Sequence, residues 1–154
     1  MPKAFIDTNV LLRLLIRDEE TQHRACVNLL RVARNEGIAL HLLPVAILEV
    51  VWVLEKVYRY PRPRIREIVE AILNTPELKI EKETVFRKAL AVYESQNIKF
   101  ADALMAHWGI DLGLTTIYTF DEKHFRKIVG LEVKIPWEQE EVNRPAAATS
   151  SRRL

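Results

Sequence analysis

Aspartate is scarce in this chain, and each position that carries it is worth locating. Five of the 21 acidic residues are Asp, namely Asp7, Asp18, Asp102, Asp111 and Asp121, and the others are Glu. Glu is a good helix former that suits helix surfaces, whereas Asp is common in helix caps, in turns and in metal sites built from oxygen ligands. Each Asp is therefore a candidate either for a structural cap or for metal chemistry.

Two of these Asp residues directly follow segments that are typical of β-strands. Asp7 follows the extended residues 3–6, and Asp121 follows residues 115–120, which include β-branched and aromatic side chains. Ligands of parallel sheets bind outside the carboxyl ends of the strands, so both carboxylates are candidates for one site. Each also has an alternative interpretation as a helix N-cap, which stabilises a helix by about 1 kcal/mol.

The remaining Asp residues are expected on helices. Asp102 lies in the first turn of a predicted helix over residues 100–112, where the helix dipole favours a carboxylate by about 0.5 kcal/mol. A purely structural role is equally open for Asp102. Asp18 is expected to cap a helix at the surface, and Asp111, near a helix C-terminus, is expected to be solvated.

Glu49 is the one polar residue in the otherwise apolar segment 45–54, which we predict to be helical. A helix that is apolar all round is expected to be buried, and a buried ionised Glu is costly unless it is paired or binds a metal. An alternative is that Glu49 pairs with an Arg or reaches solvent. On a helical wheel, its face is shared by Val45, Leu48, Trp52 and Lys56.

Four carboxylates that converge would repel one another and destabilise the fold unless cations neutralise them. A ligand set of oxygens, with one Cys in the chain and no His pair at ligand spacing, favours Mg²⁺ or Mn²⁺ over zinc. The chemistry that such a site performs is hydrolysis of phosphodiester bonds, in which the metal activates a water molecule and stabilises the leaving oxygen.

The elements that must position these residues alternate between strands and helices, which predicts an α/β fold with a mostly parallel sheet flanked by helices. Strands are predicted over residues 3–6, 38–43, 78–80, 115–120 and 131–135. Helices are predicted over residues 8–16, 19–35, 45–58, 64–73, 83–95, 100–112 and 122–128, with Gly37 as the stop of the second one. We expect one domain over residues 1–137 and a disordered tail over residues 138–154.

Composition limits the class of protein. The net charge is +2, and residues 141–154 carry three Arg and one Glu, so the rest of the chain is neutral with 20 basic and 20 acidic residues. A generally basic surface for nucleic acid is therefore excluded. Cys26 is the single Cys, which excludes an intrachain disulfide. Because no apolar run approaches the ~18 residues of a membrane span, a cytoplasmic location and no membrane partner are expected.

Four short motifs, in their order along the chain, resemble the PIN domain, and most closely the small VapC-type toxins. They are Phe5-Ile6-Asp7-Thr8-Asn9, Ile47-Leu48-Glu49, Ala101-Asp102-Ala103, and Thr119-Phe120-Asp121 followed by Phe125. The resemblance covers about residues 3–136. It implies a PIN-like three-layer sandwich with a central, mostly parallel sheet.

The resemblance also implies an activity and its residues. It implies that the chain is an endoribonuclease that depends on Mg²⁺ or Mn²⁺. The catalytic and metal-binding acidic residues of the family fall on Asp7, Glu49, Asp102 and Asp121. Asn9 and Thr119 fall on its supporting polar positions. In a toxin setting, the partners would be an RNA substrate, an antitoxin that occupies the cleft, and a second copy in a homodimer.

Other interpretations stay open at this point. Residues 59–66 carry four Arg, and of these Arg62 and Arg64 are candidates for RNA binding, although a solvated loop is the alternative. A non-catalytic RNA-binding or scaffold module, and a housekeeping RNA-processing nuclease of the same fold, are the competing functions. A phosphatase of the haloacid dehalogenase type would need a second Asp where Asn9 stands, and a dinucleotide-binding fold would need a Gly-rich turn after the first strand.

Overall fold

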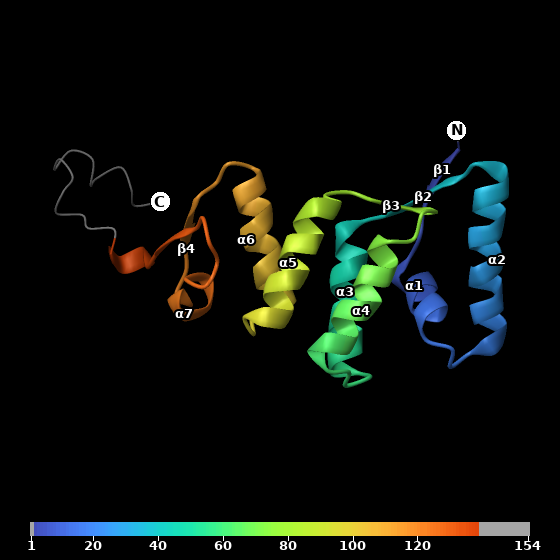
Figure 1. Ribbon diagram of the computed structural model, residues 1–154, viewed down its shortest axis with the longest axis horizontal. Coiled ribbons are helices and arrows are strands. Elements are labelled where there is room, and N and C mark those ends of the chain that lie inside the picture. Colours follow the sequence, from blue (N-terminus) through green and yellow to red (C-terminus); the bar gives the residue numbers. More distant parts are fainter. Residues whose placement is uncertain (1, 139–154) are drawn as a thin grey trace, which may run out of the picture.

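The computed structural model describes residues 2–138 of the chain (Figure 1). The strands are β1 Lys3–Phe5, β2 Ala39–Leu42, β3 Leu78–Ile80, β4 Thr116–Tyr118 and β5 Glu132–Lys134. The helices are α1 Thr8–Leu15, α2 Glu20–Glu36, α3 Pro44–Lys56, α4 Arg62–Leu73, α5 Glu83–Ser95, α6 Phe100–Asp111 and α7 Glu122–Phe125, followed by the 3₁₀ helix η1 Pro136–Glu138. The predicted tail lies outside the described residues, apart from Glu138 at the end of η1.

The strands pair in parallel throughout the described part of the chain, as the alternation of strands and helices predicts. They form two sheets, a three-stranded one in the order β1-β2-β3 and a two-stranded one made of β4 and β5. Figure 1 shows β1 to β3 towards one end of the long axis and β4 towards the other, with α5 and α6 between them. The parallel α/β class is confirmed, and the division of the strands into two sheets is an addition to it.

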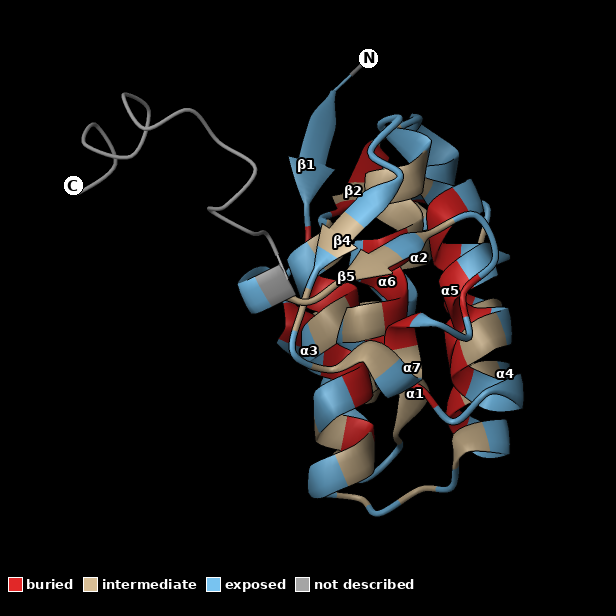
Figure 2. Cartoon of the chain, turned by 90° about the vertical axis from the view of Figure 1, so that its left-hand side faces the viewer, coloured by how far each residue is buried: buried red, intermediate tan, exposed pale blue. Residues whose placement is uncertain are grey.

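The core lies mainly among the central helices, where Figure 2 shows buried residues gathered on their facing sides. Fully buried side chains there include Ile47, Val50, Leu54, Ile65, Val69, Phe86 and Tyr93. The ring of Phe100, at the start of α6, packs edge-on against Tyr93 with the ring centroids 5.7 Å apart. The N-terminus of α6, which carries Asp102, is thus anchored in the core by an aromatic contact.

Several helix ends form where the residue types predict them. Gly37 ends α2 in the left-handed conformation at φ +67°, which glycine adopts without strain. Pro44 stands in the first turn of α3, where its missing N–H is not needed. α5 covers residues 83–95 as predicted, whereas α7 stops at Phe125, three residues earlier than predicted.

The cap of α2 corrects one prediction. Glu19, rather than Asp18, caps this helix, and its carboxylate accepts a hydrogen bond from the backbone N–H of Gln22 at 2.8 Å. Asp18 is occupied instead by Arg13 and by the Tyr58 hydroxyl, both at 2.9 Å. Asp18 thus links α1 to Tyr58 and lies one residue before the cap position of α2.

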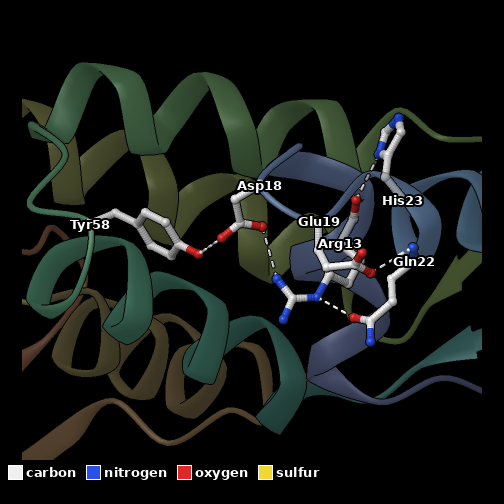
Figure 3. A network of polar contacts seen from close by, with 6 residues as sticks. All are labelled: Arg13, Asp18, Glu19, Gln22, His23 and Tyr58. Atoms are coloured by element: carbon white, nitrogen blue, oxygen red, sulfur yellow. Dashed lines mark hydrogen bonds and ion pairs between the residues drawn. The ribbon is translucent and has the colours of Figure 1, made fainter.

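Figure 3 shows the polar network that these contacts build between α1, α2 and the chain just after α3. The guanidinium of Arg13 also donates to Gln22 at 2.6 Å, and the Arg13 carbonyl oxygen lies 2.7 Å from His23 Nδ1. Through Asp18 and Tyr58, the network joins the C-terminal part of α1 to the end of α3. It therefore holds one end of α1, while the other end carries Asp7.

Two further expectations concern the surface. Asp111 is not simply solvated, because it forms an ion pair with Lys82 at 2.9 Å. Among the described residues, no helix is long and apolar enough to span a lipid bilayer.

Candidate functional site

The first two acidic motifs meet at the start of α1. Asp7 follows β1 and caps α1, and its Oδ1 accepts a hydrogen bond from the backbone N–H of Thr8 at 2.7 Å. The Thr8 hydroxyl donates to Glu49 Oε1 at 3.3 Å, although the two residues are 41 positions apart. Asp7 and Glu49 are thus neighbours of the same Thr8, and the structure brings these two predicted residues together.

Thr8 was not among the candidate residues, although it stands inside the first motif. Thr8 is a buried polar residue, with 7% of its surface exposed. A buried hydroxyl needs a hydrogen-bond partner, and here that partner is a carboxylate oxygen of Glu49. The sequence signal for this role is the position of Thr8 directly after Asp7, which makes Thr8 the first residue of the helix that Asp7 caps.

The prediction that Glu49 lies in a fully buried helix is wrong. Glu49 is exposed, and so are its neighbours on the same face, Val45 with 57% and Trp52 with 58% of their surface accessible. The opposite face of α3 packs in the core through Ile47, Val50 and Leu54. The Glu49 carboxylate therefore needs no buried counter-charge and is accessible to solvent and ligands.

The last acidic motif forms a second cluster, at the end of β4. Asp121 caps α7, and the Thr119 hydroxyl oxygen accepts a hydrogen bond from the Asp121 backbone N–H at 2.9 Å. His124 Nδ1 lies 2.9 Å from each carboxylate oxygen of Asp121. The hydrogen bond to His124, with a smaller contribution from the positive charge of Lys99, holds the pKa of the Asp121 carboxyl below its ordinary value.

Among the described residues, the side chains of Asp102 and Asn9 make no hydrogen bond or ion pair. Asp102 is half-buried in the first turn of α6, as predicted, and Asn9 is exposed in the first turn of α1. Within the part of the chain that the structure describes, no group of three or more His, Cys, Asp or Glu side chains is close enough to hold one metal ion. The structure thus places the candidates in separate clusters, one at Asp7 and Glu49 and one at Asp121.

The chemistry of these groups suits a hard divalent cation. Asp7 uses one carboxylate oxygen for the helix cap and is exposed, so its second oxygen is open to another ligand. Carboxylate and hydroxyl oxygens, as at Asp7, Thr8 and Glu49, are ligands for Mg²⁺ and Mn²⁺. The donor set fits such a cation by type, and the capping role of Asp7 does not exclude a metal-binding one.

A cleft of about 780 Å³ opens beside Glu49. Its lining includes the exposed face of α3 and, from later in the chain, Tyr93 of α5 together with Lys99, Phe100 and Ala101 at the start of α6. Asp102 follows this lining directly in the chain. Lys99, in the same lining, adds a small contribution to the lowered pKa of the Asp121 carboxyl.

The two candidate RNA-binding arginines have different surroundings. The Arg62 guanidinium donates to the carbonyl oxygens of Tyr93 and Ile98, at 2.6 and 2.7 Å, and lies 4.3 Å from the centroid of the Tyr93 ring. α4 begins at Arg62, two residues earlier than predicted, with a proline in its first turn, where the missing N–H is not needed. Arg64 is exposed and stacks over the ring of Tyr60, so its charge remains accessible.

Comparison with known proteins supplies the family. A VapC ribonuclease from Aquifex aeolicus (strain VF5) is 28% identical over 134 residues, which are 87% of this chain and 97% of that protein. The crystal structure of VapBC2 from Rickettsia felis, bound to a DNA fragment from their promoter, matches 88% of this chain and 98% of its own, with 15% identity and a TM-score of 0.35. The structural similarity at this TM-score supports no inference about this chain. The PIN domain matches residues 4–131, from β1 to the residue before β5. This chain therefore belongs to the PIN domain family.

Proposed function

We propose that this protein is an endoribonuclease that depends on Mg²⁺ or Mn²⁺ and hydrolyses RNA phosphodiester bonds, as the toxin of a toxin–antitoxin pair. The observation that carries the proposal is the contact between Thr8 and Glu49, which joins the first two acidic motifs of a PIN domain beside Asp7. The relative named as a VapC ribonuclease supports the substrate class and the toxin role.

In this proposal, Asp7, Glu49, Asp102 and Asp121 would hold the cation, and the cation would supply an activated water molecule and stabilise the leaving oxygen. Thr8 orients the Glu49 carboxylate, and Thr119 fixes the backbone in front of Asp121. Like-charged carboxylates repel one another, so the approach of the two clusters would depend on the cation that neutralises them. The proposal also includes an antitoxin that blocks the cleft, and self-association into a homodimer.

Thermal unfolding in EDTA and in millimolar Mn²⁺, combined with cleavage of a mixed RNA pool, tests the proposal. A ligand at about 100 times its dissociation constant stabilises the folded state by about 2.7 kcal/mol, which for a chain of this size corresponds to a rise in Tm of about 5–10 °C. The wild type is expected to show this rise and to cleave RNA only with the metal. The variant Asp7→Asn/Asp121→Asn is expected to show neither.

The variant Asp111→Asn serves as the matched control, because Asp111 is an exposed helical carboxylate that pairs with Lys82 outside the candidate site. It is expected to keep both the metal-dependent rise in Tm and the cleavage. The proposal is refuted if Mn²⁺ leaves the Tm of the wild type unchanged, or if the Asp7→Asn/Asp121→Asn variant responds to Mn²⁺ as the wild type does.

A further inference from the structure

One stripe along α3 is exposed although two of its four side chains, Val45 and Trp52, are apolar. Val45, Glu49, Trp52 and Lys56 follow one another at the spacing of helical turns, and all four line the cleft described above. Trp52 leaves 58% of its surface accessible. Since large aromatic side chains are usually buried, an exposed Trp in a cleft beside a candidate catalytic residue indicates a binding surface.

The charges around this cleft favour an anionic occupant. Lys56 and Lys99 contribute two accessible positive charges to the lining, and Arg62 adds a third that already donates to two backbone carbonyl oxygens, against two negative charges from Glu49 and Glu55. Glu55 accepts a hydrogen bond from the Tyr93 hydroxyl at 2.6 Å, which partly satisfies its charge. Lys56 and Lys99 are both exposed, so their ammonium groups are accessible to a ligand.

The size and the composition of the cleft suit one nucleotide with its phosphates. Its volume of about 780 Å³ lies within the range of pockets that enclose small organic ligands. Aromatic side chains stack on bases without sequence preference, and lysines contact the backbone phosphates of single strands. Trp52 and Lys56 line the cleft from α3, with Lys99 at the start of α6, and Glu49 lies between Val45 and Trp52 on the stripe.

We propose that this cleft is a subsite for one nucleotide of single-stranded RNA, next to the candidate cleavage site. The base stacks on Trp52, and the flanking phosphates are contacted by Lys56 and Lys99. Lys99 stands in the lining directly before Phe100 and Ala101, so a phosphate held there lies close in the chain to Asp102. The inference rests on the proposed function, because it assigns part of the RNA substrate to a place beside the same site.

Binding of a fluorescein-labelled, mixed-sequence RNA octamer, measured by fluorescence anisotropy in EDTA, tests this subsite without cleavage. The variant Trp52→Ala is expected to weaken binding about tenfold, because loss of one base–aromatic stack has an effect of that order. Trp52→Phe, which keeps a π-face, is expected to bind nearly as the wild type does. Leu114→Ala is the control, since Leu114 is exposed to a similar extent, with 59% of its surface accessible, and lies outside the cleft lining.

The lysines are tested in the same assay. Lys99→Gln and Lys56→Gln are each expected to weaken binding several-fold at low salt and less at high salt, because phosphate contacts are screened by ions. Lys88→Gln, an exposed lysine of α5 that does not line the cleft, is expected to have no such effect. Circular dichroism of each variant confirms that the fold is retained.

Three results would overturn the subsite: no binding of the octamer by the wild type, unchanged binding by Trp52→Ala, or an equal loss in Leu114→Ala. The second result would instead leave the cleft as a groove for a protein partner. Failure of the proposed function is distinguishable, because a wild type that binds the octamer through Trp52 but cleaves no RNA with Mn²⁺ retains the subsite and loses the nuclease.

Discussion

Replacement of Asp7 separates its structural role from its proposed catalytic role. The Asp7 carboxylate caps α1 through one oxygen, which accepts from the Thr8 N–H at 2.7 Å. In Asp7→Asn, the amide oxygen takes over this hydrogen bond, since Asn and Asp are equally good caps. What is lost is the attraction between the negative charge and the helix dipole, about 0.5 kcal/mol for an exposed residue.

The two roles predict effects of different size. A loss of about 0.5 kcal/mol lowers the Tm of a chain of this length by about 1–2 °C. Loss of a metal ligand is expected to remove several kcal/mol of transition-state stabilisation, and about 4 kcal/mol corresponds to a thousandfold lower rate. Asp7→Ala, which removes the cap as well, is expected to cost about a further 1 kcal/mol of stability with the same loss of activity.

The assay is cleavage of a mixed RNA pool with Mg²⁺ or Mn²⁺, with thermal unfolding of the same preparations. Asp111→Asn is the control, as it removes an equally exposed carboxylate that pairs with Lys82. Equal cleavage by the wild type and Asp7→Asn would show that Asp7 is not a metal ligand. A large drop in Tm in Asp7→Asn would refute the reasoning about the cap, because the amide would then fail to replace the carboxylate.

Three other predictions follow from single contacts. Thr8→Val keeps the shape of a buried side chain but removes the hydrogen bond to Glu49; urea unfolding is expected to show a loss of about 1 kcal/mol, with slower cleavage, and an unchanged rate would exclude Thr8 from orienting Glu49. Arg62→Ala is expected to lower the free energy of unfolding by about 2 kcal/mol, because it leaves two carbonyl oxygens without their donor, whereas Arg64→Ala is expected to cost under about 0.5 kcal/mol; equal losses would contradict the structural role of Arg62. His124 lowers the pKa of Asp121, so the stability from this contact is present above the unfolded-state pKa and is lost as the pH falls through the lower folded-state pKa. An NMR titration of His124→Gln is expected to show the pKa of Asp121 raised towards its ordinary value, and an unchanged midpoint would show that the contact does not act on this carboxyl.

Local signals in the sequence predicted the elements that carry the site. The parallel α/β class, the position of Asp7 and Asp121 as helix caps after strands, and the place of Asp102 in a first helical turn are all confirmed. Each depends on a few neighbouring residues, which is why the pattern sufficed. The capping interpretation of Asp7 and Asp121 is confirmed, and their role as metal ligands stays a prediction.

Packing between distant segments was harder to predict. The apolar segment 45–54 suggested a helix buried all round, but α3 leaves Val45, Glu49 and Trp52 accessible along one face. Residues that line a cleft and residues that fill a core have the same hydropathy, so composition does not separate them. Likewise, residue patterns identify strands but not their partners, and the separation of β4 and β5 from the other sheet could not be predicted from them.

Arg62 and Arg64 show why residue type alone is a weak guide to function. Both lie in the same Arg-rich segment and were equal candidates for RNA, but one donates to the backbone at the start of α6 and the other stacks on Tyr60 at the surface. Thr8 is the converse case, because a residue without an assigned role supplies the contact that spans 41 positions between the first two acidic motifs. Thr8 contacts Asp7 through its backbone N–H and Glu49 through its hydroxyl. Removal of the hydroxyl therefore tests whether Asp7 and Glu49 act together, while both carboxylates stay in place.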